Sequence, residues 1–116
     1  GAVKVIDHAQ DCGLLAPTGL ISAEMSLAVE QSGRRYVANT SSQCNVEPWA
    51  GRAGRASLTA SDFRLFDGPA CGSGESCPDF SANGAPLRFG YFDIVFSSAG
   101  EPVVHGVDNW LVTVWR

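Results

Sequence analysis

Four cysteines carry the clearest chemistry in this chain of 116 residues. An even number of cysteines in a short chain with 13 glycines is typical of a fold stapled by disulfides. The glycine-rich segment from Cys71 to Cys77 is too flexible for a helix and can close on itself as a small loop. We therefore predict the pairs Cys71–Cys77 and Cys12–Cys44. The alternative is a zinc site, but the chain has no Cys-x-x-Cys pair and only two histidines as further ligands.

Groups that could catalyse a reaction lack the surroundings that catalysis requires. His8 and His105 could act as bases or metal ligands, but no serine or cysteine lies in a nucleophile motif. The run that starts at Cys71 reads Cys-Gly-Ser-Gly and lacks the leading glycine of the Gly-x-Ser-x-Gly motif. With 12 acidic residues, some pair will have the separation of a glycosidase site by chance. We therefore expect that the protein is not an enzyme.

Aromatic side chains are the first candidates for ligand binding. An aromatic ring can stack on the apolar C–H face of a sugar. We expect Trp49 and Trp115 to be the better candidates for an exposed platform, and Tyr91 and Asn109 are further candidate contacts for a sugar. Trp110 is expected to fill the core instead, because it continues the apolar face of the last strand. The alternative for each ring is a place in the core or in an interface.

Two further sites are weaker. Asp108 and Asp93 could contribute to a calcium site, which needs about six to eight oxygen ligands. The simpler interpretation, which we favour, is that Asp108 and Asn109 cap a turn through bonds from side chain to backbone. No other cofactor is expected. The triplet that starts at Asn39 matches the N-glycosylation pattern, although such triplets are common by chance.

Short strands are the elements that would position these residues. Thirteen glycines and six prolines separate short apolar stretches, as in a β-sandwich or β-barrel. We predict a hairpin from strands 25–30 and 35–39, although a helix over 22–30 is the alternative. One brief helical turn is expected within 57–62, with Thr59 or Ser61 as its cap. The other predicted strands are 3–6, 63–66, 86–97 and 107–116.

The segment 107–116 is the clearest strand. One face carries Trp110, Val112 and Val114, and the other carries Leu111 and Trp115. Because both faces are bulky, we predict that the strand is central in its sheet or that its second face is covered.

Four segments resemble a known family. Segment 78–92 reads Pro-Asp-Phe-Ser-Ala-Asn-Gly-Ala-Pro-Leu-Arg-Phe-Gly-Tyr-Phe, and segment 106–114 reads Gly-Val-Asp-Asn-Trp-Leu-Val-Thr-Val. Both resemble the C-terminal half of exported bacterial concanavalin-like or jelly-roll domains in proteins with a PEP-type sorting signal. Segments 28–36 and 58–63 resemble earlier parts of such domains. The resemblance implies export and a jelly-roll-like antiparallel β-sandwich, but no defined activity. The four cysteines depart from the pattern, which does not require them.

Composition limits the class of partner. The net charge is −4, and the eight basic residues form no basic stripe, so we expect no nucleic-acid partner. No apolar run approaches the roughly 18 residues of a transmembrane helix, so we expect no membrane span. The length fits one all-β domain over 1–116.

We therefore expect an extracellular or cell-surface module that binds carbohydrate or a cell-surface matrix protein. The alternative is a structural subunit of an extracellular filament or matrix polymer, in which copies associate through strand pairing. A small secreted hydrolase or inhibitor is the third hypothesis.

Overall fold

The computed structural model describes residues 1–16, 21–44, 52–72, 76–97 and 104–116. The only helical element in these ranges is a single 3-10 turn, η1 (Ala60–Asp62), which begins after Thr59 as predicted. All strand pairs are antiparallel, which confirms the predicted fold class. The strands are β1 (Val5–Ala16), β2 (Ile21–Gln31), β3 (Arg34–Ala38), β4 (Ser42–Gln43), β5 (Arg52–Leu58), β6 (Phe63–Leu65), β7 (Arg88–Ser97) and β8 (Val104–Trp115).

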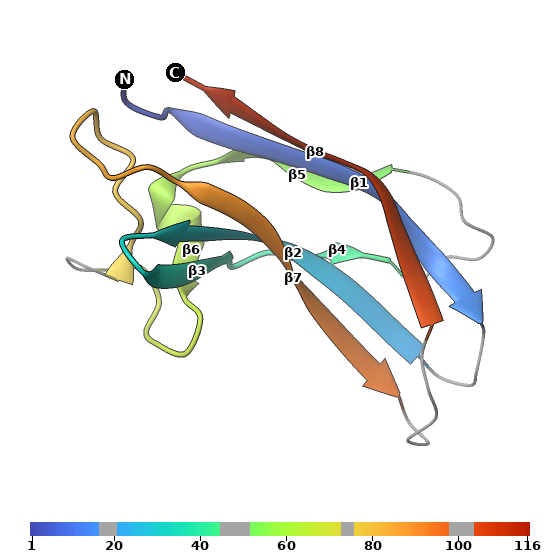
Figure 1. Cartoon of the computed structure of the whole chain (residues 1–116). Helices are drawn as coiled ribbons and strands as arrows, with labels where there is room; N and C mark the ends of the chain where they lie inside the picture. Colours follow the sequence, from blue (N-terminus) through green and yellow to red (C-terminus); the bar gives the residue numbers. More distant parts are fainter. Residues whose placement is uncertain (17–20, 45–51, 73–75, 98–103) are drawn as a thin grey trace.

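The strands form two sheets that face each other (Figure 1). The first sheet has the order β5-β1-β8. In the second sheet, β2 pairs with β3 and β4 along one edge and with β7 along the other, and β6 extends the sheet beyond β3. The arrangement is a β-sandwich, and its two layers contribute opposite walls of the core.

Buried apolar side chains fill the space between the sheets. The larger cluster joins Ile6 and Leu58 of the first sheet to Leu27, Val29 and Phe63 of the second. Each such side chain contributes roughly 1.5–3 kcal/mol when it is fully buried. These contacts between distant segments hold the two layers together.

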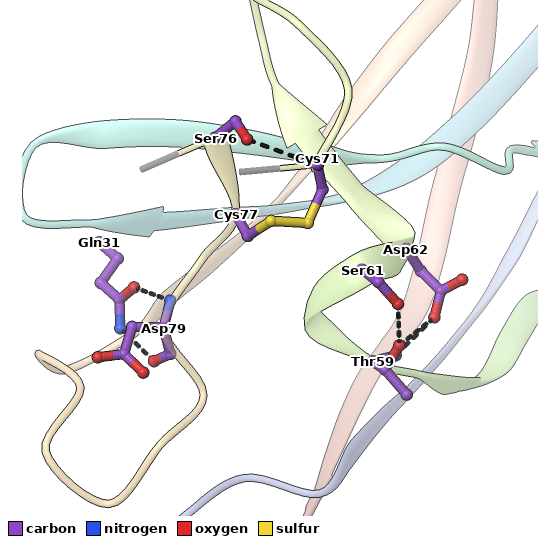
Figure 2. The surroundings of a disulfide bond; sticks show 9 residues. Gln31, Thr59, Ser61, Asp62, Cys71, Ser76, Cys77 and Asp79 are labelled. Atoms are coloured by element: carbon purple, nitrogen blue, oxygen red, sulfur yellow. Dashed lines mark hydrogen bonds between the residues drawn. A yellow bond between two sulfur atoms is a disulfide. The ribbon is translucent and has the colours of Figure 1, made fainter. Parts of the chain in front are cut away.

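Both predicted disulfides are present. Cys12 on β1 bonds to Cys44, which follows β4, so this disulfide connects the two sheets. The disulfide Cys71–Cys77 closes the loop after β6 (Figure 2). Near it, Gly72 N donates a hydrogen bond to Ser76 Oγ at 3.3 Å.

The predicted hairpin is confirmed, and the helical alternative for residues 22–30 is wrong. The turn between β2 and β3 consists of Ser32 and Gly33, with φ angles of 52° and 77°. Positive φ at both positions is the geometry of a two-residue turn that matches the twist of the flanking strands.

A glutamine at the end of β2 fixes the segment before β7. Gln31 Nε2 donates to the carbonyl oxygens of Asp79 and Ala85, at 2.8 and 2.7 Å. Its Oε1 accepts a 2.6 Å hydrogen bond from the backbone N–H of Asp79 (Figure 2). One buried amide therefore ties this segment to the hairpin.

Three expectations from the sequence were wrong, and one strand was missed. The first strand runs from Val5 to Ala16, far beyond residue 6, and β5 was not predicted at all. The strand β8 lies at the edge of its sheet and not at its centre, and Leu111 and Trp115 on its second face are exposed and not covered. Trp110 faces β7 and is 37% exposed, so it does not fill the core. The bounds of these strands and their positions in the sheets depend on pairing between distant segments. Local sequence patterns do not determine that pairing.

Candidate functional site

The outer face of the first sheet collects exposed aromatic, apolar and acidic side chains. Alternation along β1 turns Asp7 outward, and the paired strand β8 turns Thr113 and Trp115 to the same side. We call this surface the Trp115 face; it is formed by Asp7, Ala9, Asp11, Gly54, Asn109, Leu111, Thr113 and Trp115.

Trp115 is held in place by an acidic side chain. Its indole Nε1–H donates a 2.8 Å hydrogen bond to Asp7 Oδ2, and the backbone N–H of Ser57 donates a 2.6 Å bond to Asp7 Oδ1. The hydrogen bond from Ser57 lowers the pKa of Asp7, and the bond from Trp115 lowers it further. The carboxylate therefore remains ionised, and Trp115 is oriented although 53% of its surface is exposed.

An open hollow of about 410 Å³ lies beside this pair. Small residues of β1 and β5, among them Ala9 and Gly54, line it together with Leu111 and Thr113. A Cβ at Gly54 would lie only 2.1 Å from the carbonyl oxygen of His8. Glycine is therefore required where β5 approaches β1. Because Gly54 has no side chain, nothing at this position fills the hollow.

A β-bulge shapes the other end of the face. The pairing of β1 with β8 shifts register between Ala9 and Asp11, and Asn109 adopts a positive φ of 50°. Asn109 Nδ2 donates to Asp11 Oδ2 at 2.6 Å, and its backbone N–H donates to Asp108 Oδ1 at 2.7 Å. The predicted bond from the Asp108 side chain to the backbone is present, but it stabilises a bulge within β8 and not a turn.

The other predicted binding residues do not join this surface. Tyr91 belongs to β7 in the second sheet, is 52% exposed and contacts Trp110 edge-on at 6.3 Å between ring centroids. Trp49 lies outside the described residues. Asn39 follows β3 and is exposed, and its glycosylation stays a prediction.

The predicted calcium ligands come from different sheets. Asp93 is on β7 and pairs with Met25, whereas Asp108 is on β8 and pairs with Asp11. Within the described ranges, no three histidine, cysteine, aspartate or glutamate side chains are grouped as a metal site would require.

Sequence reasoning missed Asp7 and Asp11, because it ended the first strand at residue 6. The pattern of polar and apolar residues gives no such signal, because it breaks after Ile6: the inward-facing residues His8 and Gln10 are polar, and the outward-facing Ala9 is apolar.

Comparisons with protein families, curated proteins and solved structures found no match for this chain. In the part of the chain that the structure describes, no helix has the length and apolar character needed to cross a membrane.

Proposed function

We propose that this protein is a secreted, non-catalytic module that binds carbohydrate on its Trp115 face. The observation that carries the proposal is a half-exposed tryptophan that an ionised carboxylate holds in a fixed orientation. A fixed ring loses little conformational entropy when a ligand stacks on it. Two disulfides support a location outside the cell, where such bonds persist.

The Trp115 face supplies the two kinds of contact that a sugar needs. The indole offers an apolar surface for the C–H face of a pyranose ring. The hydroxyl of Thr113 near Trp115 and the carboxylate of Asp11 at the other end of the face offer hydrogen-bonding groups along the same two strands. Because the hollow is open, it is suited to a glycan that lies across the sheet and not to one that is enclosed.

A glycan array tests this proposal. The wild-type protein is expected to bind a limited set of glycans, and Trp115→Ala is expected to weaken that binding at least about tenfold, equivalent to 1.4 kcal/mol. The matched control is Trp110→Ala, which removes an exposed tryptophan of the same strand that contacts β7 instead. Absence of any glycan ligand, or equal loss in both variants, would contradict the proposal.

A second candidate function is supported by the open edges of the sandwich. The strands β7 and β8 each pair with one neighbour among the described strands, and they carry exposed Tyr91, Val95 and Trp110. Long edge strands with exposed apolar side chains can add a strand from another molecule. In this case the protein would be a subunit of a filament or matrix polymer.

Sedimentation velocity of the protein used for the glycan array tests whether copies assemble. If the protein stayed monomeric at all concentrations, assembly into a polymer would be ruled out.

A further inference from the structure

A second hollow lies on the opposite side of the molecule, on the outer face of the second sheet. Its floor is a row of small side chains across three adjacent strands, because Ala28 of β2 pairs with Val37 of β3 and with Gly90 of β7. The hollow measures about 340 Å³. We call it the Gly90 trough; it is lined by Ala28, Glu30, Arg35, Val37, Phe66, Arg88, Gly90 and Phe92.

Neither backbone geometry nor crowding requires glycine at position 90. Its φ is not positive, and a Cβ built there would meet no atom within 4 Å. Glycine in the interior of a strand weakens the strand and often marks a place where a ligand approaches closely. The missing side chain therefore has one structural effect here, which is to leave the middle of the trough open.

Two phenylalanines form the apolar wall of the trough. The ring of Phe66 meets the ring of Phe92 edge-on, with centroids 4.9 Å apart. Phe66 remains 38% exposed, so part of this wall faces solvent. Together with the small floor, the wall offers an apolar surface for a ligand of matching character.

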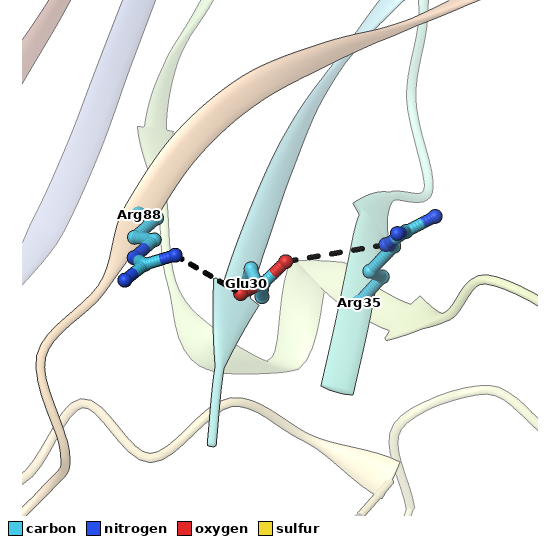
Figure 3. Close-up of polar contacts among 3 residues, drawn as sticks. All are labelled: Glu30, Arg35 and Arg88. Atoms are coloured by element: carbon cyan, nitrogen blue, oxygen red, sulfur yellow. Dashed lines mark ion pairs between the residues drawn. The ribbon is translucent and has the colours of Figure 1, made fainter. Parts of the chain in front are cut away.

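A row of charges closes one end of the trough. Glu30 lies between two arginines on the neighbouring strands, Arg88 of β7 and Arg35 of β3 (Figure 3). The charged atoms are 3.8 and 4.0 Å apart, which is longer than a hydrogen bond. Both arginine side chains are highly exposed, at 77% for Arg35 and 85% for Arg88. Two guanidinium groups against one carboxylate leave an excess positive charge at this end.

We propose that the Gly90 trough binds a small amphipathic carboxylate, a ligand with one aromatic or branched aliphatic body and one anionic group. The body lies over Gly90 and against Phe92, and the carboxylate pairs with the guanidinium of Arg88 or Arg35. Guanidinium groups match the geometry of a carboxylate through paired N–H donors. A sugar fits less well, because Ala28, Val37 and Gly90 of the floor carry no hydroxyl or amide side chain. The ring of Tyr91 packs against Trp110 of the other sheet and does not supply one there. The site is independent of the Trp115 face, which belongs to the other sheet.

Amide NMR titration with 3-phenylpropionate tests the proposal. Saturable shift changes are expected in β2, β3 and β7, and 3-phenylpropan-1-ol, which lacks the charge, is expected to bind about tenfold more weakly. Arg88→Gln should weaken the binding of 3-phenylpropionate by a similar factor. Lys4→Gln removes an exposed positive charge far from the trough and should leave the binding unchanged. Equal binding of the acid and the alcohol, or no saturable shift up to about 10 mM ligand, would overturn the proposal.

Gly90→Val separates ligand binding from folding. Valine suits a strand interior and has open space at this position, so the melting temperature is expected to stay the same or to rise. The new side chain fills the floor, so binding of 3-phenylpropionate should be lost. Unchanged binding by this folded variant would refute the site. Trp115→Ala should bind 3-phenylpropionate normally, which distinguishes failure of the trough from failure of the glycan site.

Discussion

At the scale of single residues, the interior of the sandwich contains polar groups that the core does not fully satisfy. His8 and Gln10 are buried between Ile6 and Cys12 on the inward side of β1. Their side chains meet at 3.2 Å, between His8 Nδ1 and Gln10 Oε1. No described residue provides a hydrogen-bond partner for His8 Nε2 or Gln10 Nε2. A charge on His8 would therefore lie buried with only the hydrogen bond to Gln10 to stabilise it.

The stability of the protein is expected to depend on the charge of His8. Burial lowers the pKa of His8 from the ordinary value of 6.5, and nearby Arg55 lowers it further, against the opposing effect of the hydrogen bond with Gln10. The unfolded chain therefore binds a proton at a higher pH than the folded protein. Stability should be complete above about pH 7 and should decline as the pH falls below 6.5.

Urea denaturation between pH 7.5 and pH 5 measures this effect. The denaturation midpoint of the wild-type protein should fall over this range, which lies above the ordinary titration range of carboxylates. In His8→Gln, the side chain stays polar and neutral, so the midpoint should change much less. If both proteins lose the same stability, another group causes the decline.

At the scale of elements, β5 shows how contact with a neighbour can create a strand where propensity does not. Its sequence, Arg-Ala-Gly-Arg-Ala-Ser-Leu, is poor in β-branched and aromatic residues. It nevertheless pairs with β1 over residues Arg52–Leu58, with an irregularity near Ser57, whose φ is 59°. The close approach at Gly54 is part of this pairing, because only a residue without Cβ fits against the His8 carbonyl.

Two glycines in strands are therefore expected to respond in opposite ways to alanine. In Gly54→Ala the new Cβ would lie 2.1 Å from His8 O and 2.9 Å from Ala9 Cα, both backbone atoms that cannot move without disturbing the sheet. We expect a loss of about 2 kcal/mol or more in the free energy of unfolding, as for other overpacked sites. Gly90→Ala meets no atom within 4 Å and should be neutral or slightly stabilising. Chemical denaturation measures the free energy of unfolding of both variants. If both variants lost the same free energy of unfolding, the close approach of β5 to β1 at Gly54 would tolerate a Cβ, and the prediction would be wrong.

At the scale of the whole molecule, the two disulfides act at different levels. The disulfide Cys12–Cys44 joins the two sheets, and its two cysteines are buried and lie 32 residues apart in the sequence. Cys71–Cys77 closes a separation of only 6 and constrains one loop. A longer closed loop removes more entropy from the unfolded chain.

Loss of the disulfide between the sheets should therefore destabilise the protein more. We expect about 3–4 kcal/mol for Cys12→Ala with Cys44→Ala, and about 2 kcal/mol for Cys71→Ala with Cys77→Ala. Thermal denaturation of the two double variants tests the order. A larger loss from the Cys71–Cys77 pair would show that its loop contributes more to the fold than its length implies.

The sequence by itself determined the features that depend on local chemistry. The alternation in β2 and β3, with a turn segment that contains Gly33 between them, specified the hairpin, because glycine adopts at little cost the positive φ that such a turn needs. The spacing of Cys71 and Cys77 specified their pairing, which left Cys12 with Cys44. The helical turn after Thr59 was predicted in the same way, from residues within the turn itself. In these cases, residues close in sequence set the structure.

Only the tertiary structure decided which strands became neighbours and which faces stayed exposed. The second sheet covers only the inner face of the first, so Leu111 and Trp115 lie exposed on the outer face of β8 although their pattern resembles that of a strand with both faces covered. The same pairing brings Asp7 to Trp115 across 108 positions of sequence. The physical reason is that the stability of each strand pair comes from many contacts between segments that are distant in sequence. The sequence of one segment alone does not determine those contacts.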